Sequence, residues 1–128
     1  MNNEIGIDKF NLACEWRVQT GAAAAATVTI TVPAGEAWEI IGGYCSHDDP
    51  TARTAYWVHT PLGMTARVLG DVPSLAANAR SHFYTNVIMP NAPLVVHEGD
   101  AIDVIFSAMA GGQLGTITLN CRIRYGEV

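Results

Sequence analysis

The four histidines are the side chains most suited to bind a metal or to transfer a proton near neutral pH. They are His47, His59, His82 and His97, and none has another within five residues. Zinc sites draw on closely spaced histidines or cysteines, so this spacing does not indicate one. His47-Asp48-Asp49 and His97-Glu98 do place imidazole beside carboxylate, and loops at one end of a sandwich could bring these pairs together. We interpret both pairs as solvated turn residues and keep a metal site as the alternative.

Nucleophilic catalysis has few candidates in this sequence. Cys45 and His47 stand one residue apart in a predicted exposed loop and would share a face if extended, as a thiolate and its base would. No orienting third group or oxyanion donor is evident beside them. Ser74 and Ser81 lie outside any Gly-x-Ser-x-Gly motif. We therefore expect no enzymatic activity and no cofactor.

The cysteines are three in number, which does not suit a disulfide framework. Cys14 alternates in phase with Trp16 and Val18, and Cys121 in phase with Ile117. Both phases are predicted to point inward, where a free cysteine behaves as a small apolar residue. We predict core thiols in a reducing compartment.

Aromatic residues could offer stacking platforms to a saccharide. Trp16 and Trp38 are in phase with predicted core residues, where large aromatics belong. Trp57 and Tyr56 occupy opposite faces of one predicted strand, and Trp57 is the candidate for an exposed ring. This pair is the basis for considering a glycan-binding role.

The elements that would position these side chains are strands. In residues 26–32, alanine, valine and isoleucine alternate with three threonines, which is the period of a half-buried strand. Pro33-Ala34-Gly35-Glu36 then supplies turn chemistry. Similar runs occur at 10–19, 37–44, 53–59, 65–69, 82–89, 94–97, 101–108 and 116–125.

The connections complete the predicted fold. Residues 21–26 are expected to form a small-residue link, and Gly42-Gly43 a bulge or a close backbone approach. Residues 46–51 are expected to form an exposed turn, and residues 72–81 a helical turn capped by Ser74. About eight strands at ten-residue spacing predict an all-β, antiparallel β-sandwich of the jelly-roll type. We assign residues 1–9 to an N-terminal arm and residues 10–128 to a single sandwich domain.

The composition of the chain limits the kinds of molecule that it is expected to bind. The chain has 128 residues, 49% of them apolar and only 15% charged, with a net charge of −5. Low charge favours a surface packed against other subunits, since interface cores are depleted in charge; a small, tight sandwich with short loops is the alternative. The sequence has no basic run, no long apolar segment and no signal peptide, so we expect no nucleic-acid or membrane partner and synthesis in a cytoplasm.

Three stretches carry a resemblance to a known family. Residues 32–40 (VPAGEAWEI), 96–104 (VHEGDAIDV) and 117–125 (ITLNCRIRY) resemble small jelly-roll structural proteins of tailed bacteriophages, in particular capsid cement (decoration) proteins. The resemblance implies a homotrimer on the outside of the head, whose partner is the major capsid protein. A phage tail-associated or host-glycan-binding sandwich is the alternative. A cupin-like metal enzyme is a further one, although the His-x-His of the first cupin motif does not occur.

The resemblance also implies where the partner would be contacted. In that family an N-terminal arm or a loop at the capsid-facing end makes the contact. The corresponding candidates here lie in the arm and in the connection after residue 70. They are Met1, Asn2, Asn3, Glu4, Ile5, Ile7, Val72 and Leu75.

Deleting residues 1–9 should therefore spare the fold and weaken attachment to phage heads, because the arm has no hydrophobic period that ties it to a core. Thermal unfolding and co-sedimentation with undecorated heads measure the two effects. If the truncated chain decorates heads normally, the arm has been assigned wrongly.

Overall fold

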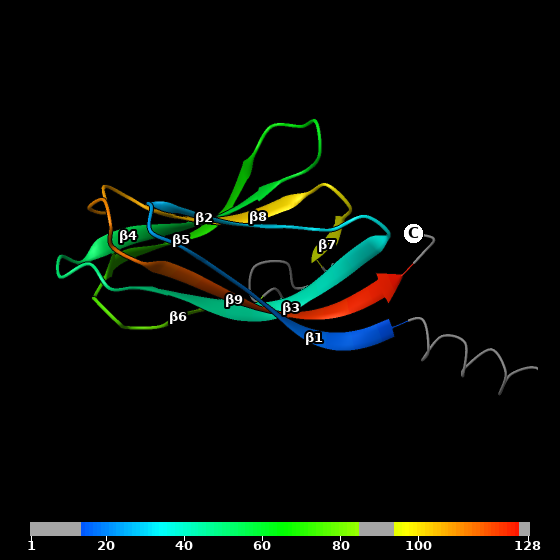
Figure 1. Ribbon diagram of the computed structural model, residues 1–128, viewed down its shortest axis with the longest axis horizontal. Coiled ribbons are helices and arrows are strands. Elements are labelled where there is room, and N and C mark those ends of the chain that lie inside the picture. Colours follow the sequence, from blue (N-terminus) through cyan, green and yellow to red (C-terminus); the bar gives the residue numbers. More distant parts are fainter. Residues whose placement is uncertain (1–13, 85–93, 126–128) are drawn as a thin grey trace, which may run out of the picture.

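The structure, a computed structural model, describes residues 14–84 and 94–125, and these form nine strands (Figure 1). The strands are β1 (Cys14–Ala23), β2 (Thr27–Thr31), β3 (Glu36–His47), β4 (Arg53–Thr60), β5 (Arg67–Leu75), β6 (Ser81–Tyr84), β7 (Leu94–His97), β8 (Ala101–Phe106) and β9 (Gly115–Tyr125). The described part contains no helix that could cross a membrane.

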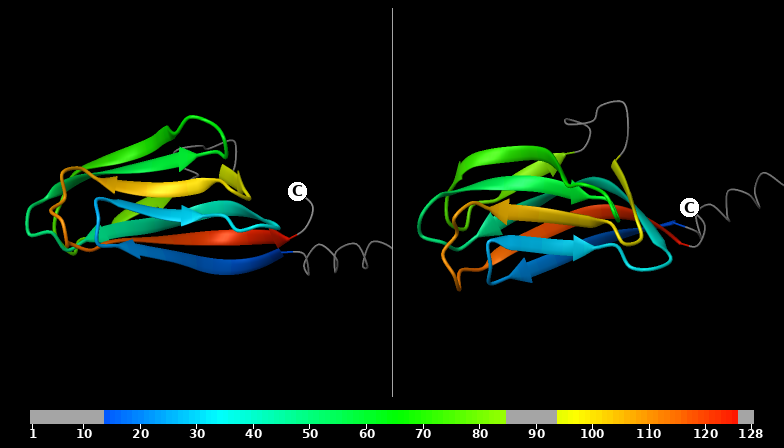
Figure 2. Two further views of the ribbon diagram at one scale, coloured as in Figure 1. Left: turned by 45° about the horizontal axis from the view of Figure 1, so that its top comes forward. Right: turned by 90° about the horizontal axis from the view of Figure 1, so that it is seen from above.

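Two antiparallel sheets lie face to face (Figure 2). One sheet has the order β1-β9-β3-β6, with β7 also paired to β3, and the other has the order β2-β8-β4-β5. β7 pairs with the first half of β3 and β6 with its second half, so two short strands share one sheet position. The sandwich therefore has eight positions and nine strands, which confirms the predicted jelly roll.

The core between the sheets follows the predicted alternation in most strands. Val28, Ile30 and Val32 are buried while the threonines between them are exposed. On β9, Ile117, Leu119, Cys121 and Ile123 are buried, as their phase predicts. Trp38, Trp57 and Phe106 are the bulkiest of the fully buried side chains.

A β-bulge in β3 changes which residues of that strand face the core. The register with β9 shifts between Ile40 and Gly42, so Ile41 is the extra residue. A Cβ on Gly43 would lie 2.1 Å from the Thr118 carbonyl oxygen, so only glycine fits this approach. Both features predicted for the Gly-Gly pair are confirmed.

The bulge also overturns one expectation. Beyond it, Cys45 and His47 face the core and are almost fully buried. β3 continues to His47, and Asp49 is buried as well, so the predicted exposed turn at residues 46–51 is wrong at these positions. The reason is the shift in phase: one extra residue sends every later side chain of the strand to the opposite face.

The first strand has the opposite phase from the predicted one. Val18, expected inside, is 58% exposed. A Cβ on Gly21 would lie 3.0 Å from Ile30 Cγ1, so β1 passes close to β2 and a larger residue at this point would crowd Ile30. β1 runs to Ala23, and the predicted link at residues 21–26 is thus partly strand. The arm at residues 1–9 lies outside the described residues.

The predicted helical turn at residues 72–81 is wrong. Residues 67–75 form the edge strand β5, so only a short connection at 76–80 separates it from β6. Ser74 does not cap a helix; it has a φ of 60° inside the strand. Pairing with β4 overrides the local preference of these residues, because an edge strand tolerates irregular backbone.

Ile30→Asp should abolish folding, because Ile30 is only 8% exposed and its replacement would bury an unpaired carboxylate. Such a burial costs several kcal/mol against a total stability of about 5–15 kcal/mol. Circular dichroism during heating measures the loss. Thr27→Asp, on the exposed face of the same strand, is the matched control and should unfold like the wild type; a folded Ile30→Asp protein would refute the strand's phase.

Candidate functional site

The β4–β5 hairpin carries the most exposed apolar side chains of the described residues. Leu62, Met64 and Val68 are 69%, 68% and 65% exposed. Figure 1 shows this hairpin standing away from the four-stranded sheet. We call residues 61–68 the apolar hairpin. Exposed apolar side chains that gather on one element mark an interaction surface.

A buried carboxylate holds the base of the apolar hairpin. Asp100 is 6% exposed and accepts hydrogen bonds from the backbone N–H of Leu62 at 2.8 Å and of His97 at 3.0 Å. His59 Nε2 lies 3.3 Å from the same carboxylate. Asp100 therefore connects the hairpin to the turn between β7 and β8.

The contacts of His59 define its tautomer. Arg67 Nη2 lies 3.2 Å from His59 Nδ1, and a guanidinium has no acceptor, so it donates to this nitrogen. Nδ1 must then be unprotonated, and the ring hydrogen is on Nε2, from where it is donated to Asp100. One imidazole thus links a residue of the hairpin to the buried carboxylate.

Gly99 lets the hairpin lie against the β7–β8 turn. It has a φ of +84°, and a Cβ there would lie 2.7 Å from Leu62 Cδ2. Any other residue would be strained in this conformation and would press against Leu62. The turn and the hairpin are therefore fitted to each other.

Electrostatics favour the ionised form of Asp100. Burial acts to raise the pKa of Asp100, but hydrogen bonds from the His97 and Leu62 N–H groups and from His59 outweigh it, so the pKa lies below its ordinary value. The carboxylate is a permanent acceptor at neutral pH, and the hairpin is held in place under those conditions.

The second acid–histidine pair lies at the other end of the sandwich. His47 Nε2 donates to the Leu75 carbonyl at 2.7 Å, and Asp49 accepts from the N–H groups of Thr51 and Ala110, both at 2.9 Å. These backbone hydrogen bonds, with Arg53 beside the carboxylate, lower the pKa of Asp49 to about 2. His47 and Asp49 therefore hold neighbouring segments in place through hydrogen bonds to the backbone.

The metal-site alternative is not supported by this arrangement. His97 pairs with Ala37 at one end of β3, and His47 lies at the other end, ten residues or about 33 Å away along the strand. In the ranges 14–84 and 94–125, no three His, Cys, Asp or Glu side chains are grouped closely enough to hold a metal. The two pairs are separated because β3 runs the full length of the sandwich.

The structure does not support Cys45 and His47 as a nucleophile and its base. Cys45 is fully buried, and burial raises the pKa of its thiol to about 12. His47, two residues on, already donates to a carbonyl oxygen. Cys121 is also a buried free thiol, as predicted, and burial raises its pKa to about 12. The side chain of Cys14 lies outside what the structure describes.

Trp57 is not an exposed stacking platform. Its side chain is 2% exposed and belongs to the core, while Tyr56 is half-buried. Trp38 is buried as predicted. The Trp57–Tyr56 basis for saccharide binding is therefore wrong, because β4 is an internal strand with its Trp57 face covered by the other sheet.

The predicted contact residues fall in two places. Met1, Asn2, Asn3, Glu4, Ile5 and Ile7 lie outside the described residues. Leu75 is 6% exposed and part of the core, and Val72 is half-buried against it. Leu75 thus offers a partner little surface. The sequence analysis did not single out the exposed side chains of the apolar hairpin; a leucine and a methionine beside Pro61 and Gly63 were the available signal.

Comparison with known proteins assigns the chain to no family. No protein-family model matches the chain, and no curated protein matches it.

Several solved structures are similar at low identity. A chain of the Bacillus endospore appendages, which are disulfide-linked pili, is 17% identical with a TM-score of 0.44, covering 90% of this chain and 88% of that one. A chain of the virus-like particle of Macrobrachium rosenbergii extra small virus is 11% identical with a TM-score of 0.45, covering 90% and 81%. The N-terminal cellulose-binding domain of Cellulomonas fimi β-1,4-glucanase C is 11% identical with a TM-score of 0.37, covering 88% and 89%.

Asp100→Asn should destabilise the protein by about 1–3 kcal/mol at pH 7, since the amide replaces one acceptor oxygen with a donor. In the wild type, the contribution of the Asp100 carboxylate to stability is complete above pH 3.8, the ordinary pKa of an aspartate. It is lost as the pH falls through the lowered pKa of Asp100. Urea unfolding at pH 7 and amide exchange of Leu62 across the acid range measure these effects. Asp71→Asn, at an exposed position of β5, is the control; equal stability of Asp100→Asn and wild type would contradict the proposed role of the carboxylate.

Proposed function

We propose that this chain is a non-enzymatic structural subunit of a virion: a decoration protein that binds the outside of a phage head as a homotrimer and stabilises it. The observation that carries the proposal is the apolar hairpin, which exposes three large apolar side chains and is held by a buried carboxylate at its base. The resemblance of residues 32–40, 96–104 and 117–125 to capsid cement proteins supports the same role.

The apolar hairpin is suited to docking because its shape is set before binding. Asp100, His59 and Gly99 fix its base, so little conformational entropy remains to be lost on contact. Binding costs are lower for a surface that is already ordered. The phage head would therefore bind an apolar hairpin that is already ordered.

The energetics favour an oligomer. Burying one large apolar side chain contributes about 1.5–3 kcal/mol, so three contribute about 4–9 kcal/mol. Association itself costs about 4–15 kcal/mol, which leaves one hairpin with weak affinity. Three hairpins on a trimer bind as linked sites and convert weak contacts into firm attachment. A closed ring of three also leaves no open end for further growth.

Replacing Leu62 and Met64 by aspartate should reduce attachment to undecorated heads of the phage that encodes the chain by at least tenfold, because 1.4 kcal/mol corresponds to a factor of ten. Co-sedimentation measures the affinity. Light scattering should give both proteins a mass three times the 13.7 kDa of the chain.

Leu114→Asp is the matched control, since Leu114 is 42% exposed at a site outside the hairpin. It should bind heads like the wild type. Undiminished binding of the hairpin variant would contradict docking through the hairpin, absence of any binding by the wild type would overturn the decoration role, and a monomeric mass would overturn the trimer.

A further inference from the structure

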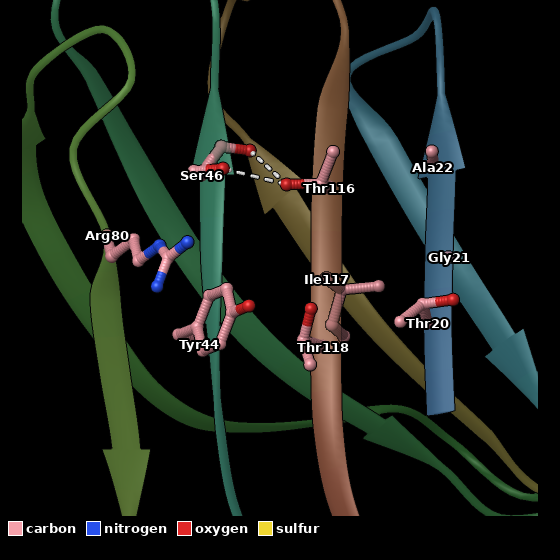
Figure 3. Close-up of a pocket in the computed structure, with 9 residues that line it drawn as sticks. All are labelled: Thr20, Gly21, Ala22, Tyr44, Ser46, Arg80, Thr116, Ile117 and Thr118. Atoms are coloured by element: carbon pink, nitrogen blue, oxygen red, sulfur yellow. Dashed lines mark hydrogen bonds between the residues drawn. The ribbon is translucent and has the colours of Figure 1, made fainter. Parts of the chain in front are cut away.

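A polar trough crosses the outer face of the five-stranded sheet (Figure 3). It has a volume of about 450 Å³ and is lined from β1, β3, β9 and the residue before β6. Tyr44 and Ser46 on β3 face outward because the neighbouring Cys45 faces the core. The trough spans three strand spacings, about 14 Å, from the β6 side to β1.

Hydroxyl groups form the floor of the trough. Ser46 Oγ and Thr116 Oγ1 are hydrogen-bonded to each other at 2.7 Å. Within the described residues, the hydroxyls of Tyr44, Thr118 and Thr20 have no hydrogen-bond partner. These three groups come from three adjacent strands, and each can donate and accept one hydrogen bond to a ligand.

A cation stands at one end of the trough. The Arg80 guanidinium lies 4.6 Å from the centroid of the Tyr44 ring and points toward β3 (Figure 3). None of the residues that line the trough is acidic, and no carboxylate pairs with Arg80 in the part of the chain that the structure describes. Stacking on Tyr44 orients the guanidinium and leaves its N–H donors for an anionic group.

The floor restricts what kind of ligand can bind. β3 and β9 are internal strands whose backbone groups are used in the sheet, so a peptide cannot be added as a further strand. Recognition must use side-chain hydroxyls, one aromatic ring and one cation. A chain of sugar hydroxyls with a carboxylate at one end complements this set.

We propose that the trough is a binding site for an acidic saccharide, with Arg80 pairing with its carboxylate and the Tyr44, Thr118 and Thr20 hydroxyls bonding its hydroxyl groups. This site is in the sheet opposite the one that carries the apolar hairpin, so contact through the hairpin does not itself cover the trough (Figure 1). The proposal does not depend on the decoration role, because the isolated protein should bind.

The test uses two acidic saccharides, trigalacturonate and 3′-sialyllactose, with galactotriose and lactose as their uncharged counterparts. Titration followed by NMR should show that at least one acidic saccharide binds and that its counterpart binds at least tenfold more weakly. The loss of a hydrogen bond to a charged group corresponds to about this factor or more. Arg80→Gln should lose the same tenfold, and Thr118→Val should lose severalfold.

Arg124→Gln is the matched control, because Arg124 is an exposed arginine on the outward phase of β9, at the end far from Thr116 and Thr118. It should bind like the wild type, and thermal unfolding confirms that each variant is folded. Failure of both acidic saccharides to bind at millimolar concentration overturns the proposal. Equal binding of the uncharged sugars, equal binding of hexaglutamate, or undiminished binding by Arg80→Gln overturns it as well.

Discussion

The pairing of β3 with β9 is the constraint on which most of the molecule depends. β3 runs the length of the sandwich, and its contact with β9 is so close at Gly43 that no side chain fits there. The extra residue at Ile41 then decides the face of every residue that follows. Cys45 and His47 complete the core, and Tyr44 and Ser46 are left on the outer surface. The contribution of β3 to the core beyond the bulge, and its contribution to the polar trough, both follow from this one irregularity.

Buried carboxylates organise the two ends of the sandwich. Asp49 and Asp100 each accept one backbone N–H from their own turn and one from a segment distant in sequence, and each has a basic side chain close by. A buried anion without such donors would be costly, whereas here the donors outweigh the burial. Each carboxylate thereby connects two loops at its end of the sandwich. An ordered loop is able to present a defined surface.

The two candidate surfaces differ in chemistry and lie on different layers. The apolar hairpin belongs to the four-stranded sheet and exposes leucine, methionine and valine. The trough belongs to the five-stranded sheet and offers hydroxyls and one arginine. Apolar burial suits attachment to a protein surface, while directional hydrogen bonds suit a polar ligand. The two proposed binding activities would therefore use separate surfaces.

The sequence by itself determined the class of fold and much of the core. Alternation at Val28, Ile30 and Val32 and at Ile117 to Ile123 is a property of neighbouring residues, and the sheets preserved it. The glycine pair at 42–43 even indicated the bulge. Only the tertiary structure decided which face the residues of β3 after the bulge occupy. It also decided that Val18 is exposed and that Trp57 is buried. It also decided that Asp100 supports Leu62, 38 residues away in sequence. Such outcomes depend on which strands become neighbours, and the local pattern of one strand does not contain that information.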